Sequence, residues 1–385
     1  MPDPSFPGRD EAWLKARGGL WTAREIAQQP EMLRLTQSQL IAGRAGIEAF
    51  IAPLLQRKDL RIILTGAGTS AFYRRKPGAV AVVTSEAHRR GHTHHRPGLR
   101  AGALFRRRRA DLLVSFGRSG NSPESLAAVE LADSCVPRRP PPRHYLQWRR
   151  RPGPLCRPGA HGYCLLMPEA THDHGFAMTS SYSCMTLAAW PSLPASARWK
   201  AGSGAIAGAV AGVLDTALAH LQPAVAEDYE RVAYLGSHVF KGLAREAGLK
   251  LLELTNGGIA TLFDSPLGFR HGPKTFVNGR TLVLVFLSNN PHTRRYDIDL
   301  LDELKRDGEA GRVIAVTARG GVTDALAIAG MEEAQDIDLI FPYIAVAQIF
   351  AFQQSLRRGL TPDQPNTQGT VNRVVQGVRI HERIA

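Results

Sequence analysis

Asp111-Leu-Leu-Val-Ser-Phe-Gly-Arg-Ser-Gly-Asn-Ser-Pro-Glu-Ser125 is the stretch of this 385-residue chain that decides the fold class. Its first six residues form an apolar run typical of a buried strand. Ser122 and Pro123 then supply an N-cap and a first helical residue, so a helix follows the strand after a short turn. A strand that leads directly into a helix is the repeating unit of α/β proteins with a parallel sheet.

The second half of the chain repeats this alternation of strands and helices. Such alternation predicts a doubly wound parallel sheet with helices on both faces, and ligands bind these sheets at the carboxyl ends of the strands. The fold class is therefore α/β. We predict strands at 231–236, 281–288, 312–318 and 337–341, and helices at 239–255, 296–306 and 343–357.

The chain is long enough for two domains, because single hydrophobic cores rarely grow past about 250 to 300 residues. Near its start, Thr22 and Glu25 have the spacing of a capping box that opens a short helix. We also expect a longer helix from 31 to 55 and a linker helix from 204 to 221. The predicted organisation is a helical extension at 1–34, a first α/β domain at 35–215 and a second at 216–385.

Hydropathy and cysteine content indicate a soluble protein of a reducing compartment. No stretch approaches ~18 uninterrupted apolar residues, as a membrane span would require, and the start MPDPSFPGRDEAW lacks the basic and apolar regions of a signal peptide. No C-x-x-C spacing occurs, and few cysteines in so long a chain suit the cytoplasm. We expect no membrane partner, no metal site and no structural disulfide among Cys135, Cys156, Cys164 and Cys184.

The net charge of +14 comes from two short windows of the chain. Residues 73–110 contain eleven Lys or Arg and one acid, and residues 136–163 contain seven and none, which leaves the remainder of the chain at −3. A basic fold would favour nucleic acid as a partner. Because the charge is confined to two windows, we expect no nucleic-acid partner.

These two windows, and a shorter one at 190–205 that interrupts an expected helix, are rich in Arg, Pro, His and Gly and lack a regular period. Three interpretations remain open: basic nucleic-acid-binding loops with a histidine metal site, a disordered insertion, or out-of-frame translation of a GC-rich gene between compensating insertions and deletions. We favour the last. If the window at 73–110 is real protein, the first sheet is expected to lack a strand. The histidine metal site of the first interpretation would consist of His88, His92, His94 and His95.

Two hydroxyl-rich turns follow strands in the first half. One comes after the apolar run 61–65, and the other lies at the start of the helix after 111–116, where the helix dipole and unpaired N–H groups favour an anion. Glycines let the backbone approach phosphate, although an ordinary turn or helix capping would use the same residues. A third cluster, Met178 to Tyr182, opens another helix and contains Thr179. The candidate phosphate contacts in the two turns are Gly68, Thr69, Ser70, Arg118, Ser119, Asn121 and Ser122.

The second half carries candidate acid and base groups. Glu246, Lys250 and Glu253 fall at i, i+4 and i+7 of a predicted helix, so they share one face. Such a face is often solvated and salt-bridged, but this helix is otherwise nearly all apolar, which favours a cleft. His271 lies in a loop made rigid by Gly and Pro, and an imidazole that titrates near neutrality suits acid/base work, although a loop histidine is often structural.

Together these motifs resemble the SIS (sugar isomerase) family, in particular its AgaS-like branch of galactosamine-6-phosphate deaminase/isomerases, also described as tagatose-6-phosphate ketose/aldose isomerases. The resemblance covers about 300 of the 385 residues. It implies two SIS domains, each a flavodoxin-like parallel sheet flanked by helices. The motifs are GAGTS (66–70), SFGRSGNSPES (115–125), EATHDHGFAMTSSYS (169–183), REAGLKLLE (245–253), LGFRHGPK (267–274) and NRVVQGV (372–378).

The resemblance also implies roles for individual residues. Glu253 matches the base that moves a proton between C2 and C1 of the sugar, His271 matches the ring-opening histidine, and Glu246 and Lys250 match polar residues beside the base. Gln376 stands where a related synthase presents a lysine, and is expected to contact the substrate without an amine. The expected contacts with phosphate or sugar include Thr69, Ser70, Ser119, Ser122 and Thr179.

The activity implied is conversion of an amino-sugar 6-phosphate, with galactosamine 6-phosphate favoured over its glucosamine epimer, to a ketose 6-phosphate and ammonia. No glutaminase segment with a leading cysteine precedes the domains, so the reaction is expected to release ammonia. No cofactor is expected. Homodimers or homotetramers are expected from the family. The alternatives are a simple ketose/aldose phosphate isomerase and a non-catalytic sugar-phosphate sensor.

Overall fold

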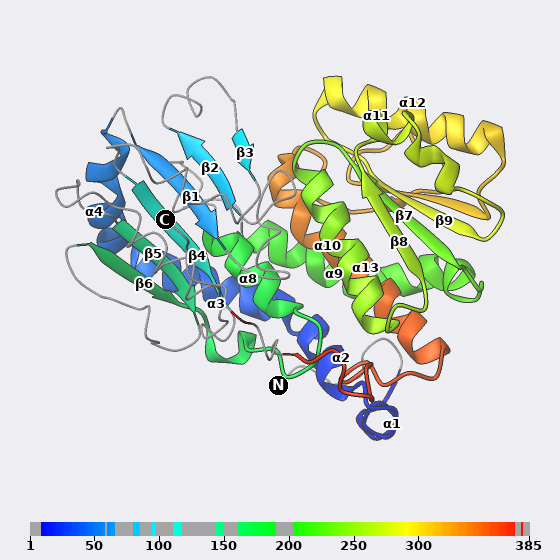
Figure 1. Ribbon diagram of the computed structural model, residues 1–385, viewed down its shortest axis with the longest axis horizontal. Coiled ribbons are helices and arrows are strands. Elements are labelled where there is room, and N and C mark those ends of the chain that lie inside the picture. Colours follow the sequence, from blue (N-terminus) through cyan, green and yellow to red (C-terminus); the bar gives the residue numbers. More distant parts are fainter. Residues whose placement is uncertain are drawn as a thin grey trace. The chain divides into compact units, whose positions relative to one another are not determined.

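The computed structural model describes residues 9–57, 60–65, 80–84, 94–96, 111–117, 144–149, 161–189, 203–373 and 379 (Figure 1). The chain forms two compact units. Unit 1 comprises Met1–Arg34, Asp173–Ser183 and Ala201–Thr370, and unit 2 comprises Leu35–His172, Cys184–Lys200 and Val371–Ala385. The boundaries expected near residues 35 and 215 remain a prediction.

Unit 1 contains a five-stranded sheet in the order β11-β10-β9-β7-β8. All neighbouring strands are parallel, and Tyr234 on β7 lies opposite Leu284 on β9 and Phe263 on β8. Numbered along the chain and read from β8, this order is 2-1-3-4-5, which is the flavodoxin-like arrangement. The predicted α/β fold class is therefore confirmed. The strands are β7 Arg231–Gly236, β8 Ala260–Asp264, β9 Thr281–Phe286, β10 Arg312–Thr317 and β11 Leu326–Ala327.

The local sequence accounts for the elements of this sheet. The run Thr281–Phe286 is buried at every position, as expected for a central strand covered on both faces. Helix α12 (Pro291–Asp307) begins where Asn290 accepts hydrogen bonds from the N–H groups of His292 and Thr293 at 3.0 and 3.1 Å. It ends at Gly308, whose φ of 67° is easiest for glycine.

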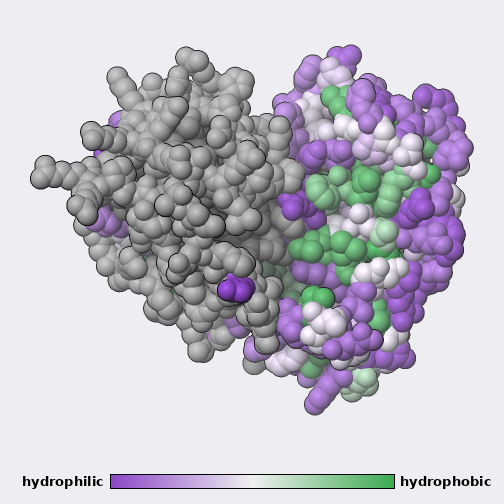
Figure 2. Space-filling model, in the orientation of Figure 1, coloured by the Kyte–Doolittle hydropathy of each residue, from purple (hydrophilic) through white to green (hydrophobic). Residues whose placement is uncertain are grey.

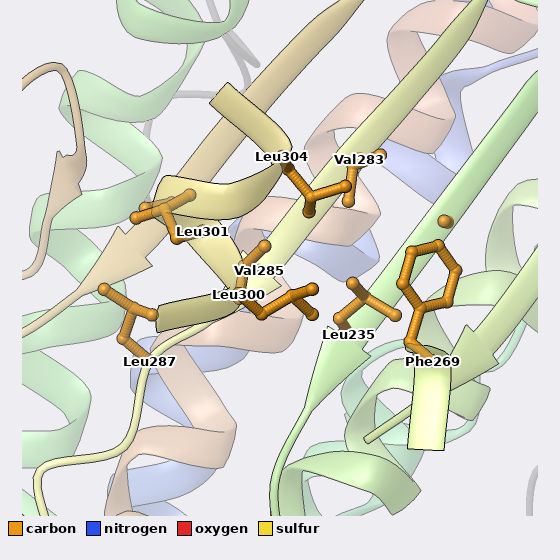
Figure 3. Packing of buried hydrophobic residues seen from close by; sticks show 10 residues of the cluster. Leu235, Phe269, Val283, Val285, Leu287, Leu300, Leu301 and Leu304 are labelled. Carbon is orange, nitrogen blue, oxygen red and sulfur yellow. The ribbon is translucent and has the colours of Figure 1, made fainter. Parts of the chain in front are cut away.

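One face of the sheet packs against α12 and the short helix α11 (Pro266–Phe269), and Figure 3 shows the side chains that fill this layer. They come from β7, β9, β10 and both helices, and each is almost completely buried. Complete burial of a Leu, Val or Phe side chain contributes roughly 1.5 to 3 kcal/mol. This core fixes the sheet to the helices on that face. Its larger members are Leu235, Phe269, Val283, Val285, Leu287, Leu300, Leu301 and Leu304.

Helix α13 (Asp336–Arg357) crosses the other side of unit 1 and packs against α10 (Val239–Leu254) and α9 (Ser203–Val225). Residues 337–341 belong to this helix, so the predicted strand there is wrong. A short apolar run fits a buried helix as well as a strand, and α13 is buried along nearly its whole length.

Two stretches among the described residues are long and apolar enough to span a membrane by length and composition, Gly204–Val225 and Asp336–Arg357. In the second, 94% of the apolar window is buried inside the protein, which is typical of a core helix. In the first, 39% of the window is buried, and this helix packs along α13. Burial in the core thus accounts for the apolar composition of α13.

Unit 2 contains a six-stranded sheet in the order β3-β2-β1-β4-β5-β6. Strands β1, β4, β5 and β6 are parallel, whereas β2 and β3 pair antiparallel at one edge. The windows at 73–110 and 136–163 thus contain strands. Because the sheet of unit 2 has six strands, two of them from the window at 73–110, the expectation that the first sheet lacks a strand is wrong. The segment Val-Ala-Val-Val-Thr has the branched side chains that favour a strand. The bounds are β1 Arg61–Thr65, β2 Val80–Thr84, β3 His94–Arg96, β4 Asp111–Phe116, β5 His144–Arg149 and β6 Gly162–Leu166.

The helices at the start of the chain differ from prediction. The expected capping box is wrong: Thr22 lies inside α2, whose N-cap is Gly19, and its hydroxyl donates to Asp363 at 2.8 Å. The long helix expected from 31 to 55 is two helices that meet at Gly43. Their bounds are α1 Glu11–Ala16, α2 Leu20–Ala27, α3 Gln29–Ala42 and α4 Arg44–Leu55.

Two cysteines lie within the described residues. Cys184 is buried and free, whereas Cys164 on β6 is disulfide-bonded. The prediction of no structural disulfide is therefore wrong at Cys164. A count of cysteines indicates a compartment, but bonding depends on how closely the fold brings two thiols together.

Candidate active site

A tight turn carries the chain from β7 into α10, the helix with the candidate acid and base groups. A Cβ atom at Gly236 would lie 2.5 Å from Cβ of Phe240, so only glycine fits at the end of this strand. His238 follows with a φ of 49°, which is unusual for a residue other than glycine. The close turn fixes where α10 starts relative to the sheet.

Glu246, Lys250 and Glu253 do share one face of α10, as predicted. Nζ of Lys250 lies 3.4 Å from Oε1 of Glu246 and donates a hydrogen bond to Oε2 of Glu253. The side chains of Glu246 and Lys250 are completely buried, whereas 23% of the Glu253 side chain is exposed. The charged face is thus not a solvated surface. It leaves a single carboxylate, that of Glu253, partly open to a ligand.

Electrostatics keep Lys250 charged despite its burial. Burial alone lowers the pKa of an ammonium group, but the neighbouring charges of Glu246 and Glu253, with hydrogen bonds to both, raise the pKa of Lys250 above its usual value. A buried cation between two acids is stable only because its partners compensate the lost hydration. Lys250 therefore places a lasting positive charge beside the Glu253 carboxylate.

His271 lies in the loop between α11 and the 3₁₀ turn η5 (Pro273–Phe276). Its backbone N–H donates to the carbonyl of Gly268 at 3.1 Å, and the residue is exposed. Gly272 follows with a φ of 109°, a conformation that other residues rarely adopt. Within the described part of one chain, no hydrogen bond or ion pair joins His271 to Glu253, so the structure does not bring these two predicted residues together.

Sequence reasoning missed a polar network at the carboxyl ends of β7 and β9, where the strand order of unit 1 reverses. Asp297 accepts hydrogen bonds from Ser237 Oγ at 2.5 Å and from the N–H of Ser288 at 3.0 Å. Asp336 accepts one from the N–H of Asn289 at 2.7 Å. Serine hydroxyls and backbone amides at such a crevice are typical anion ligands. Here the protein's own carboxylates already occupy them.

The same network shifts the pKa of one of its acids. Burial, with a smaller contribution from the charge of Asp336, raises the pKa of Asp297 to about 6. Arg294 lies nearby and donates to Oγ1 of Thr317 at 2.9 Å and to the carbonyl of Arg319 at 3.0 Å. The sequence gives a signal for this network, because Ser288, Asn289 and Asn290 follow β9 one residue after its end, and hydroxyl and amide groups likewise follow strands in the first half.

Thr179 is the one predicted phosphate contact within the described residues. It is completely buried, and its N–H and Oγ1 lie 2.8 and 3.4 Å from the two carboxylate oxygens of Asp173. Asp173 also accepts from Ser180 and Ser181, so it holds the first turn of α8 (Ser180–Ala189). A direct contact of Thr179 with phosphate stays a prediction.

The remaining predicted contacts lie outside the described residues: Gly68, Thr69, Ser70, Arg118, Ser119, Asn121, Ser122 and Gln376. The same is true of His88 and His92, and of the side chains of His94 and His95. Among the residues that are described, no group of three or more His, Cys, Asp or Glu side chains could hold a metal ion.

Comparison with known proteins gives relatives along nearly the whole chain. It is 41% identical over 384 residues to the D-galactosamine-6-phosphate deaminase AgaS of Escherichia coli, covering 95% of this chain and 97% of the relative. It is 38% identical over 378 residues to the enzyme of the same name from Shewanella sp. (strain ANA-3), covering 96% and 93%.

Solved structures of similar fold point to the same family. The crystal structure of tagatose-6-phosphate ketose/aldose isomerase from Escherichia coli superposes with a TM-score of 0.82 at 37% identity, covering 99% of this chain and 100% of the other. Glucosamine-6-phosphate deaminase from Thermotoga maritima, with a TM-score of 0.55 at 18% identity and coverage of 90% and 98%, shares the fold. No family model matches the chain. Identity near 40% over almost all of both chains is decisive, and this chain is an enzyme of the AgaS family with the SIS fold.

Proposed function

We propose that this chain deaminates an amino-sugar 6-phosphate, with galactosamine 6-phosphate favoured, to a ketose 6-phosphate and ammonia. The observation that carries the proposal is the charged face of α10, where a buried lysine holds the one partly exposed carboxylate, Glu253. The names of the AgaS relatives support the same substrate.

In the proposed reaction, His271 assists ring opening, which gives a free aldehyde at C1 and leaves the amine at C2. The Glu253 carboxylate then removes the proton from C2 while the carbonyl oxygen at C1 gains a proton. Return of a proton to C1 leaves an imine at C2. Water adds to this imine, and loss of ammonia gives the ketone. General acid/base groups of this kind contribute about 10² to 10⁴ each in rate.

Lys250 and Glu246 support Glu253 in this scheme without touching the substrate. Lys250 fixes the Glu253 side chain by a hydrogen bond and supplies a positive charge, and Glu246 balances that charge from the buried side. A carboxylate held in one position loses less entropy on reaching the transition state. The phosphate would be bound by Thr69, Ser70, Ser119 and Ser122, and the sugar by Gly68, Arg118, Asn121, Thr179 and Gln376.

A direct test is ammonia release by the purified chain from galactosamine 6-phosphate and from glucosamine 6-phosphate. The proposal predicts turnover of at least one, with the galactosamine epimer preferred. Binding of both sugars without ammonia release would contradict it and would favour the sensor alternative.

A second candidate is the simple interconversion of a ketose and an aldose phosphate. It is favoured by the likeness to a structure that carries the name tagatose-6-phosphate ketose/aldose isomerase. The same proton transfer would serve it, because only the imine hydrolysis is missing. Interconversion of tagatose 6-phosphate and galactose 6-phosphate without ammonia release from any amino sugar would establish this alternative.

We further propose that the enzyme is a cytoplasmic homodimer or homotetramer without a nucleic-acid or membrane partner. Figure 2 shows apolar residues gathered on the face of unit 1 that carries α10 and β8, bordered by hydrophilic residues. Leu252 on α10 is 37% exposed, and Leu267 on α11 is 47% exposed. Apolar residues gathered on a surface are typical of contacts between subunits. His271, exposed and not bonded to Glu253 of its own chain, would then serve the active site of a neighbouring subunit.

A further inference from the structure

Two cations flank His271 in the sequence, and both reach the same helix. Nε of Arg270 lies 2.8 Å from Oε2 of Glu303 as an ion pair. Nζ of Lys274 donates to the other oxygen of Glu303, Oε1, and also to Oδ2 of Asp307. Glu303 and Asp307 are one turn apart on α12. We call these four residues the α12 clamp.

The clamp is formed by charged groups at neutral pH. Hydrogen bonds from Lys274, and the positive charges of Arg270 and Lys274, lower the pKa of the Glu303 carboxyl despite some burial. Hydrogen bonds to Asp307 and Glu303 raise the pKa of Lys274. Both shifts favour the ionised pair, so the clamp is lost only when pH falls far enough to protonate Glu303 or rises far enough to neutralise Lys274.

The rest of the loop is also fixed. Ser265 Oγ accepts from the N–H of Gly268 at 3.2 Å, and Thr275 Oγ1 donates to the carbonyl of Gly272 at 2.8 Å. Phe269 is completely buried in the core next to α12. Thus the neighbours of His271 on both sides are anchored, while the imidazole itself is presented on the surface.

The side chains of the α12 clamp are 23 to 32% exposed, and ion pairs between partly solvated groups usually contribute little to stability. Four charges that converge on both sides of one exposed histidine are better explained by positioning. We propose that Glu303, with Asp307, is a positioning residue that holds the His271 imidazole in the orientation needed for ring opening. This inference rests on the proposed function for the role of His271, but the rigidity it predicts does not.

The first test measures the rigidity of the loop that carries His271 and does not require the enzyme to be active. Amide hydrogen exchange is followed by mass spectrometry in peptides covering 266–276, in the full chain and in Glu303→Gln. The matched control is Asp302→Asn, which removes an exposed carboxylate from the neighbouring position of α12. We expect at least about tenfold faster exchange in this loop for Glu303→Gln, with no change for Asp302→Asn. Unchanged exchange in Glu303→Gln would overturn the inference.

The second test is a double-mutant cycle on kcat with His271→Ala. We expect Glu303→Gln to lower kcat about 10-fold or more with KM within about twofold, since misplacement by 1 Å costs up to ~10². In the His271→Ala background the same substitution should have no further effect, and Glu303→Asp should restore part of kcat. An equal loss in both backgrounds would show a structural role and contradict the inference. If the wild type itself shows no turnover, the proposed function fails. The exchange result still shows whether Glu303 holds the loop in place.

Discussion

Lys250 is the residue on which the geometry of the site depends most. Its ammonium group is completely buried and is balanced by Glu246 on one side and Glu253 on the other. Taking charges out of water costs several kcal/mol, and only close partners offset that cost. The proposed base, Glu253, is therefore held by a group that is itself completely buried.

Replacement of Lys250 by Met should strongly destabilise the fold. The substitution leaves the completely buried Glu246 carboxylate without its cation, and breaking a buried pair in this way costs about 3 to 5 kcal/mol. Urea unfolding of Lys250→Met, compared with the exposed control Lys305→Met, measures the loss. Combining Lys250→Met with Glu246→Gln should recover part of it. A single variant as stable as the wild type would contradict the assigned burial.

At the scale of residues, the sequence predicted the α10 face well because helical spacing alone decides which side chains are neighbours. It could not predict that Thr22 and Glu25 have other partners. Thr22 bonds Asp363, and Glu25 accepts from the N–H groups of His174 and Gly175. These contacts join segments more than a hundred positions apart, and a local capping pattern carries no information about them.

At the scale of elements, Glu25 joins α2 to the segment that leads into α8. Both its oxygens lie 3.1 Å from the N–H of Gly175, and the side chain is buried. A Cβ at Gly175 would lie 2.9 Å from Oε2 of Glu25, so the glycine permits this approach. Burial first, and then the negative charge of Asp173, raise the pKa of Glu25 to about 9.

This pKa predicts how stability depends on pH. The folded state holds the proton up to about pH 9, whereas the unfolded chain releases it near 4.5, so stability from this group is lost as pH rises between those values. In Glu25→Gln, the free energy of unfolding should fall less steeply from pH 6 to 9, by up to about 1.4 kcal/mol per pH unit. Thermal or urea unfolding across that range measures the slope. Glu31→Gln, at an exposed position of α3, should keep the wild-type slope; an identical slope in Glu25→Gln would contradict the prediction.

The elements of unit 1 are largely predictable, with three exceptions among the strands: β8, the short β11 and the segment 337–341. Strands β7, β9 and β10 are apolar runs flanked by turns, and their positions were predicted to within two residues. Strand β8 (Ala260–Asp264) was missed because it is a short edge strand of mixed polarity. The strand predicted at 337–341 is part of α13, because periodicity cannot separate a fully buried helix from a strand over five residues. Only packing against α9 and α10 decides that this segment is helical.

At the scale of the whole molecule, the three irregular windows are the main question. Strands β2 and β3 lie in the first window and β5 in the second. Strand β2 pairs antiparallel with both β1 and β3, whereas β1, β4, β5 and β6 are parallel. We predict that resequencing of the gene will reveal compensating insertions and deletions around residues 73–110, 136–163 and 190–205. A continuous reading frame, with no helix- or strand-patterned peptide in either shifted frame, would contradict this.

The proposed oligomer gives a prediction of its own. If His271 serves the site of a neighbouring subunit, hetero-oligomers of Glu253→Gln and His271→Ala contain some sites with both groups intact. Co-expressed and co-purified variants should therefore show activity above that of either alone. Hetero-oligomers without such recovery would show that both groups act within one chain.

The most direct test of the central claim is the kcat for ammonia release in Glu253→Gln. Because Glu253 is proposed to move the proton between C2 and C1, kcat should fall by at least about 10², while KM changes little. Glu309→Gln, which removes an exposed carboxylate elsewhere in unit 1, should keep wild-type activity. A Glu253→Gln enzyme within tenfold of the wild type would contradict the account.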